Sequence, residues 1–138
     1  MVMQKFILIV LSCLWVNSVH ALSAVVDYVY DGDTFSGQVI VTLDIAVDVR
    51  VRLINVDTPE IKGQCEAEKK MAQQARQALQ DMLPSGTIVE LRHVKDDKYL
   101  GRIDANVILP DGRDVGAVLI KKGLGRAYKG GKRQAWCK

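Results

Sequence analysis

The order of strand-like and helix-like segments along the chain is the feature that most restricts its fold. Short runs rich in β-branched and aromatic residues favour strands, and turn signals separate them. Segment 66–82 repeats apolar residues at helical spacing, and a second, shorter helix is expected over 115–122, before Gly123. The expected strands are 25–30, 34–43, 47–56, 87–94 and 102–109. Three strands, a helix, two strands and a helix predict an α+β domain. Its centre is a small five-stranded OB-type β-barrel, with about two to three helices.

Local patterns sharpen this prediction at three places. Residues 47–54 alternate apolar with mainly charged side chains, which is typical of a strand with one buried face. Glu66 and Glu68 lie in the first turn of the long helix, where the helix dipole favours negative charge. Asp114 stands where its side chain can cap the second helix.

The first 21 residues have the features of a secretory signal. Lys5 precedes an apolar run over 6–16, and residues 17–21 end in a Val-x-Ala pattern that a signal peptidase could cut. The run is shorter than the roughly 20 residues that a membrane-spanning helix needs. A lipoprotein signal ending at Cys13 is a second alternative, but the apolar run continues past that cysteine. We therefore expect cleavage after residue 21. Residues 22–138 would then form one exported, monomeric domain without a membrane anchor, either periplasmic or secreted.

Charge excludes a polybasic binding protein. The whole chain has a formal net charge of +3, and loss of Lys5 with the signal would reduce it to +2. So slight an excess attracts an anionic partner only weakly. Any strong attraction must come from where the charges are placed.

The cysteines predict one covalent link. Loss of the signal removes Cys13 and leaves Cys65 and Cys137, and an even number in an exported protein favours a disulfide. Metal ligation is the alternative, but the chain has no CxxC motif and His93 would be the one remaining histidine.

The absence of several sequence motifs narrows the chemistry. With His93 alone and no Gly-x-Ser-x-Gly motif, a histidine-dependent catalytic triad has no support. No glycine pattern of a phosphate-binding loop or a dinucleotide site is present. Carboxylates and arginines are the chemical groups that remain.

Two acidic motifs follow strands that a small barrel would bring side by side. They are Asp31-Gly32-Asp33-Thr34 and Asp57-Thr58-Pro59-Glu60. Each alone is also typical of an ordinary turn. Together, three carboxylates would suit a hard divalent cation such as Ca²⁺, which prefers oxygen ligands.

Two arginines complete the pattern. Arg52 precedes the second acidic motif on the same strand, and Arg102 follows a turn that contains Gly101. A lone arginine usually belongs to a solvated face. A pair beside a cluster of carboxylates and a metal ion can instead hold phosphate oxygens bidentately and offset the charge of a phosphodiester transition state.

These motifs, in this order, resemble the staphylococcal nuclease (thermonuclease) family over about residues 25–128. The matching segments are 31–34, 52–60 and 97–102. The resemblance implies that Ca²⁺ is held by the side chains of Asp33 and Asp57 with the backbone carbonyl of Thr58. It further implies that Glu60 is the general base or orients the attacking water, and that Arg52 and Arg102 bind the scissile phosphate. Lys98, Tyr99 and Tyr128 are candidates for substrate binding, the tyrosines by stacking or hydrogen bonding.

The chain departs from the family pattern at two positions. Leu100 separates Tyr99 from the Gly-Arg pair that usually follows directly, which could shift Tyr99 relative to Arg102. The short loop 61–65 contains Cys65, so a bond to Cys137 would tie the loop beside Glu60 to the C-terminus and restrict its motion.

The expected activity is Ca²⁺-dependent hydrolysis of DNA and RNA with little sequence preference, giving 5′-hydroxyl and 3′-phosphate ends. A non-catalytic OB-type module that binds nucleic acid is the main alternative. An exported structural or inhibitor domain is a third hypothesis, which accounts for the disulfide but not for the acids and arginines. A binding module would have no need of a base such as Glu60 beside a metal site.

Overall fold

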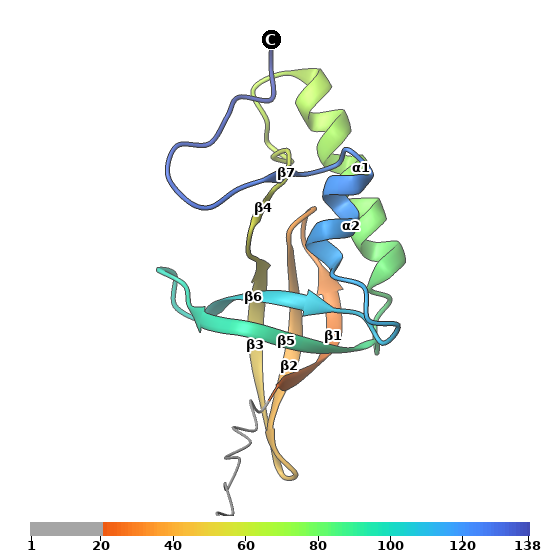
Figure 1. Cartoon of the computed structure of the whole chain (residues 1–138), viewed down its shortest axis with the longest axis vertical. Helices are drawn as coiled ribbons and strands as arrows, with labels where there is room; N and C mark the ends of the chain where they lie inside the picture. The colour runs from red at the N-terminus through yellow and green to blue at the C-terminus, as the bar shows by residue number, and fades with distance from the viewer. Residues whose placement is uncertain (1–20) are drawn as a thin grey trace, which may run out of the picture.

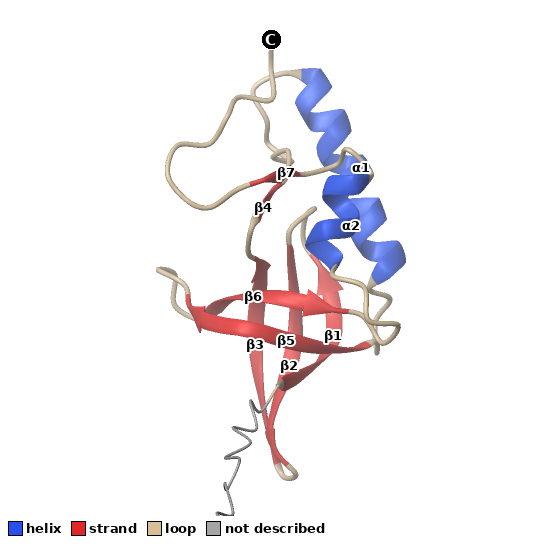
Figure 2. Cartoon of the chain, in the orientation of Figure 1, coloured by secondary structure: helices blue, strands red, loops and turns tan. Residues whose placement is uncertain are grey.

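The computed structural model describes residues 21–138, so almost all of the predicted signal lies outside the described residues. Five of the strands form a closed barrel, and both helices lie at one end of it (Figures 1 and 2). This confirms the predicted α+β fold. In chain order the elements are β1 (Leu22–Val29), β2 (Thr34–Thr42), β3 (Ile45–Leu53), β4 (Val56–Asp57), α1 (Glu66–Met82), β5 (Ile88–Asp96), β6 (Arg102–Ile108), α2 (Val115–Lys121) and β7 (Arg126–Ala127).

The barrel closes in the order β1-β2-β3-β6-β5, with β5 returning to β1. Neighbouring strands are antiparallel except for β3 and β6, which run parallel. The parallel register places Arg52 opposite Asp104 and Arg50 opposite Arg102. Arg52 and Arg102, which are fifty residues apart in the chain, therefore lie on adjacent strands.

The core fills the barrel and continues under the helices. Phe35 and Val51 are fully buried inside the barrel. Leu79 of α1 and Leu119 of α2 are fully buried at the end that the helices cover. Each such side chain contributes about 1.5–3 kcal/mol of transfer free energy.

The alternating pattern of the third strand predicts burial correctly over only half its length. Val51 and Leu53 are buried, whereas Val47 is 45% exposed. The reason is that β3 pairs with β6 only from residue 50 onward, and its first half belongs to a hairpin with β2 that extends beyond the barrel (Figure 1). No second layer covers that hairpin within residues 21–138.

The helix signals are confirmed, with one difference. The side chain of Asp114 caps α2 by accepting a hydrogen bond from the backbone N–H of Ala117 (3.0 Å), and α1 has the predicted bounds. Glu66 is exposed at the start of α1, as expected of an acid at the helix dipole. Glu68, however, is 5% exposed and turns inward.

A second, two-stranded sheet was not predicted. β4 pairs antiparallel with β7, with Asp57 opposite Arg126. Strands of two residues are too short to show a periodic pattern. This small sheet matters because it holds Asp57 beside the C-terminal part of the chain (Figure 1).

Cys65 and Cys137 form the predicted disulfide, with an S–S distance of 2.07 Å. The bond joins the residue that precedes α1 to the segment that follows β7. Across residues 21–138, none of the helices has the length and apolar character needed to cross a membrane.

Loss of this disulfide should destabilise the fold markedly. The bond closes a loop with a sequence separation of 72 residues. In the chain-entropy model, closing a loop of this length restricts the unfolded chain and raises the free energy of unfolding by about 4 kcal/mol. Urea unfolding of a C65S/C137S variant should show a lower midpoint and a steeper slope, because the unfolded chain without the cross-link is less compact and exposes more surface. The parent protein in dithiothreitol should behave like the variant, and the variant should not respond to dithiothreitol. An equal midpoint for parent and variant would contradict this assignment of stability.

Candidate active site

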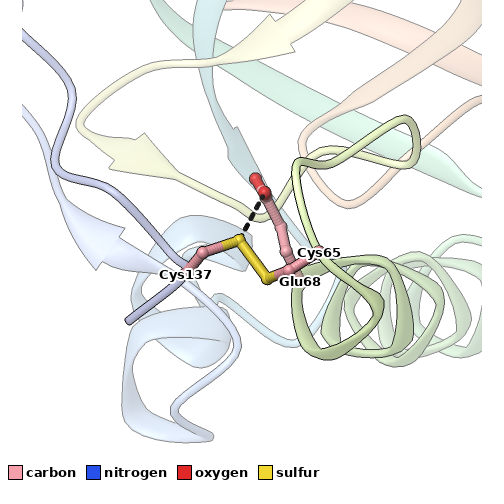
Figure 3. Close-up of side chains that lie close together, drawn as sticks. All are labelled: Cys65, Glu68 and Cys137. Atoms are coloured by element: carbon pink, nitrogen blue, oxygen red, sulfur yellow. Dashed lines mark hydrogen bonds between the residues drawn. A yellow bond between two sulfur atoms is a disulfide. The ribbon is translucent and has the colours of Figure 1, made fainter.

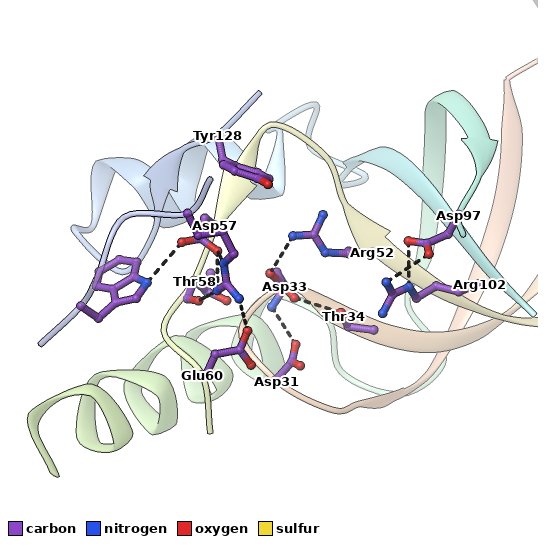
Figure 4. A network of polar contacts seen from close by, with 12 residues as sticks. Asp31, Asp33, Thr34, Arg52, Asp57, Thr58, Glu60, Asp97, Arg102 and Tyr128 are labelled. Carbon is purple, nitrogen blue, oxygen red and sulfur yellow. Dashed lines mark hydrogen bonds and ion pairs between the residues drawn. The ribbon is translucent and has the colours of Figure 1, made fainter. Parts of the chain in front are cut away.

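The predicted site residues converge on one open cleft of about 550 Å³ at the helix-bearing end of the barrel. Figure 4 shows Asp33 and Arg52 between the Asp57–Glu60 group and the Asp97–Arg102 pair. The predicted residues that line the cleft are Asp33, Arg52, Glu60, Lys98, Tyr99, Arg102 and Tyr128. Asp57 and Thr58 do not line it, because both are buried, each with 2% of its surface exposed.

Asp33 is held by the turn between β1 and β2. Gly32 is required there, because a Cβ at this position would lie 2.7 Å from the Cβ of Ala75 in α1. The backbone N–H of Asp33 donates to Asp31 (3.1 Å), and the hydroxyl of Thr34 donates to Asp33 (2.9 Å). Burial and the neighbouring charge of Asp31 raise the pKa of Asp33, the charge of Arg52 lowers it, and the net result is a pKa of about 7.

The oxygens around this turn fit a hard divalent cation. Asp33 and Asp57 are both largely buried carboxylates, and burial of a carboxylate is unfavourable unless a positive partner is supplied. Asp33 has Arg52 at 3.7 Å, a loose ion pair. With the carbonyl of Thr58, this set offers only oxygen ligands, which Ca²⁺ prefers.

Arg102 is positioned by the loop that precedes it. Its guanidinium donates two hydrogen bonds to Asp97 (2.9 and 3.1 Å) and lies 4.5 Å from the centre of the Tyr99 ring. Leu100 is fully exposed, so the extra residue bulges into solvent and Tyr99 stays in contact with Arg102. The ammonium group of Lys98 lies 5.1 Å from the centre of the same ring.

Burial alone would raise the pKa of Asp97, but hydrogen bonds from Arg102 and from the backbone of Tyr99 lower it to about 2. Asp97 is therefore ionised at any pH well above 2, and it pairs with Arg102 as a carboxylate. The pair leaves the remaining guanidinium hydrogens of Arg102 free to bind an anion in the cleft.

Asp104 also lines the cleft, although none of the sequence motifs includes it. It faces Arg52 across the β3–β6 register. One of its carboxylate oxygens is buried without a hydrogen-bond partner among residues 21–138. Burial raises the pKa of Asp104, and the nearby Asp97 raises it further. Only the closure of the barrel brings this acid to the site, so no local pattern marks it.

The loop that carries Glu60 is organised by the buried carboxylate of Glu68. It accepts hydrogen bonds from the backbone N–H groups of Gln64 (2.7 Å) and Glu60 (3.4 Å). Figure 3 shows Glu68 beside the disulfide, with the Cys137 sulfur 3.5 Å from its carboxylate. These three side chains are close enough to hold a metal ion. The two sulfurs are bonded to each other, however, so the group serves as a structural link.

The C-terminal segment supplies two residues that lie outside all the sequence motifs. Arg133 donates to the carboxylate of Asp57 (2.5 Å), to the carbonyl of Thr58 (3.0 Å) and to Glu60. The indole N–H of Trp136 donates to the second carboxylate oxygen of Asp57 (3.2 Å). Burial would lower the pKa of Arg133, but the hydrogen bonds to Glu60 and Asp57 outweigh it and raise the pKa above its usual value.

The cysteines carry the signal that could have located Arg133. Once Cys137 is bonded to Cys65, the residues just before Cys137 must lie near the loop that follows Glu60. An arginine four residues before Cys137 is then within reach of the acids of that loop.

The ion pair between Asp97 and Arg102 should be visible in a titration. In the parent protein, carboxyl carbon NMR should give Asp97 a pKa of about 2. An Arg102→Gln variant removes the hydrogen bonds but leaves the burial, so its Asp97 should titrate at higher pH. The pKa of Asp97 is lower in the folded state than in the unfolded chain. Asp97 therefore stabilises the fold at pH values above its ordinary, unfolded-state pKa, and this stabilisation is lost as the pH falls toward 2.

Asp111 provides the control, since a backbone hydrogen bond from Arg113 lowers its pKa independently of Arg102. An Asp97 pKa that does not change in Arg102→Gln would contradict the assigned pairing.

Comparison with known proteins identifies the family. The family model described as "Staphylococcal nuclease homologue" matches residues 50–136, which include Arg52, Glu60 and Arg102 and exclude Asp33. A protein of Escherichia coli named "Uncharacterized endonuclease" is 31% identical over 104 residues, which cover 73% of this chain. The chain spans 58% of the length of that relative. The chain belongs to the staphylococcal nuclease homologue family.

Proposed function

We propose that this protein is a Ca²⁺-dependent nuclease that hydrolyses phosphodiester bonds of DNA and RNA with little sequence preference, leaving 5′-hydroxyl and 3′-phosphate ends. One observation carries the proposal. Two arginines, Arg52 and Arg102, share a single cleft with Asp33 and Glu60, in a chain of the staphylococcal nuclease homologue family. The name of the relative from Escherichia coli, an endonuclease, supports the same class of activity.

The arginines would bind the phosphate that is cleaved. Arg52 and Arg102 come from the parallel strands β3 and β6, so their guanidinium groups can approach one phosphate from the same side. Each can hold two phosphate oxygens. In the transition state the phosphate gains negative charge, and donors held in place before the reaction stabilise it without reorganisation. Arg102, fixed by Asp97, would also stabilise charge on the 5′ oxygen as the P–O5′ bond breaks.

Glu60 would act on the attacking water. Its side chain is 54% exposed at the cleft, so water can reach it, and Glu68 fixes the backbone of its loop. Glu60 can accept a proton from the water or orient it toward phosphorus. Asp33, Asp57 and the carbonyl of Thr58 would hold Ca²⁺. When bound, the ion would act as a Lewis acid that offsets negative charge on the phosphate.

A groove beside the cleft suits a polymeric substrate. It has a volume of about 1110 Å³, runs along β1, β2 and β3, and shares Tyr99 and Arg102 with the cleft. Arg50 lies 4.7 Å from the centre of the Tyr30 ring within this groove. Exposed aromatic rings and guanidinium groups bind single-stranded nucleic acid by stacking and charge, with little preference for sequence. Tyr99 and Tyr128 would contact the nucleotides that flank the cleaved bond.

The disulfide supports a working place outside the reducing cytoplasm. We propose that residues 1–21 direct export and that residues 22–138 act as a monomer in the periplasm or the medium.

Glu60→Gln and Arg102→Ala should each reduce the rate of DNA cleavage by about 10²–10³-fold, the usual effect of removing one group that stabilises a transition state. The assay is plasmid DNA with added Ca²⁺ or with a calcium chelator, and circular dichroism checks the fold. Arg92→Ala is the matched control. Arg92 is an exposed arginine of β5 paired with Glu90, and it lines neither cavity.

The products give a second test. Polynucleotide kinase should label them directly, because their 5′ ends carry hydroxyl groups. Cleavage that persists in the chelator, or full activity in both variants, would contradict the mechanism. Tight binding of DNA without cleavage by the parent protein would favour a nucleic-acid-binding module.

A further inference from the structure

The C-terminal segment, residues 129–138, forms no helix or strand and reaches the acidic end of the cleft through Arg133. Several contacts hold it in place. The guanidinium of Arg126 lies 3.6 Å from the centre of the Trp136 ring and donates to the carbonyl of Ala135 (2.9 Å). The hydroxyl of Tyr128 donates to the carbonyl of Gly131 (2.7 Å). The disulfide at Cys137 fixes the end of the segment.

Both ion pairs that Arg133 makes within residues 21–138 are with groups that the proposed function needs. Its guanidinium donates to Asp57, to the carbonyl of Thr58 and to Glu60. The first two are proposed cation ligands and the third is the proposed base. Trp136 takes the other carboxylate oxygen of Asp57, so both oxygens of that side chain are engaged by the C-terminal segment.

We propose that Arg133 is a tethered competitor of the divalent cation, and that the disulfide between Cys65 and Cys137 sets how strongly it competes. The proposal rests on the proposed function, because it takes Asp57 and Thr58 as ligands of the cation. In the absence of the cation, the guanidinium of Arg133 occupies this site. Binding of the cation then requires the guanidinium to leave.

Shared lone pairs and charge make the two occupants exclusive. Ca²⁺ takes six to eight oxygen ligands at about 2.3–2.6 Å. The hydrogens of Arg133 point at oxygens of Asp57 and Thr58 that the ion would use. A guanidinium left in contact with these oxygens would also repel the ion, because two positive charges at so short a separation repel strongly in a partly buried site.

The tether makes this competition intramolecular. Cys137 lies four residues after Arg133, and Cys65 lies five residues after Glu60, so a short covalent path joins the arginine to the loop of its acceptors. A short tether holds a group at an effective concentration in the millimolar range or above. Reduction of the bond to two thiols, with dithiothreitol oxidised to its cyclic disulfide, frees the end of the segment and lowers that concentration.

Calorimetric titration of the protein with CaCl₂, without nucleic acid, tests the proposal. Arg133→Ala should tighten the apparent dissociation constant by about tenfold, the factor expected if the arginine occupies the site in roughly nine-tenths of the molecules. Dithiothreitol should tighten the parent's constant in the same direction. It should add little in Arg133→Ala, because both changes remove the same competitor.

Lys132→Ala is the matched control, since it removes the same charge from the neighbouring residue. Lys132 is exposed and makes no ion pair within residues 21–138. Equal tightening in both variants would overturn the proposal in favour of a net-charge effect. Unchanged or weaker binding in Arg133→Ala would overturn it directly. An absence of Ca²⁺ binding in every variant would instead contradict the cation assignment of the proposed function, so the two failures are distinguishable.

Discussion

The parallel pairing of β3 with β6 is the constraint on which the site depends. It closes the barrel, and among the strands of residues 21–138 it is the one parallel pairing. Because α1 and β5 intervene in sequence, the pairing joins parts of the chain that no hairpin could join. It places Arg52 opposite Asp104. It also brings Arg102, at the start of β6, close to the turn that contains Asp33. Without this pairing, the acids and the arginines would lie on separate strands and turns and would not share a cleft.

The electrostatic potential in the cleft depends on where the charged side chains lie and not on the net charge of the chain. The chain has only a small positive excess. The two ends of the cleft nevertheless differ. Glu60 lies at one end with the buried Asp57 behind it, Arg102 and Asp97 lie at the other, and Asp33 and Arg52 lie between them (Figure 4). A cation at the acidic end would neutralise it and leave the arginines facing the phosphate. In this structure Arg133 supplies positive charge at that end.

The sequence was informative wherever a signal is local. Helical spacing placed α1 with its observed bounds, and the turn motifs selected Asp33, Glu60 and Arg102, which share the cleft. Local signals failed where contacts are made across the fold. β4 and β7 are too short to show a period, and Asp104 becomes part of the site only through strand pairing. The inward turn of Glu68 depends on the N–H groups of the Glu60 loop. Arg133 reaches its acids through the small second sheet and the disulfide, which a pattern of single residues does not encode.

Trp136 gives the site an optical property. It is the one tryptophan among residues 21–138, and its indole N–H touches Asp57 while a guanidinium covers its face. Indole emission depends on polarity and charge within a few ångströms of the ring. The tryptophan fluorescence of residues 21–138 therefore originates beside the carboxylate on which the chemistry would depend, so a change at Asp57 would alter the intrinsic emission of the protein without an attached dye.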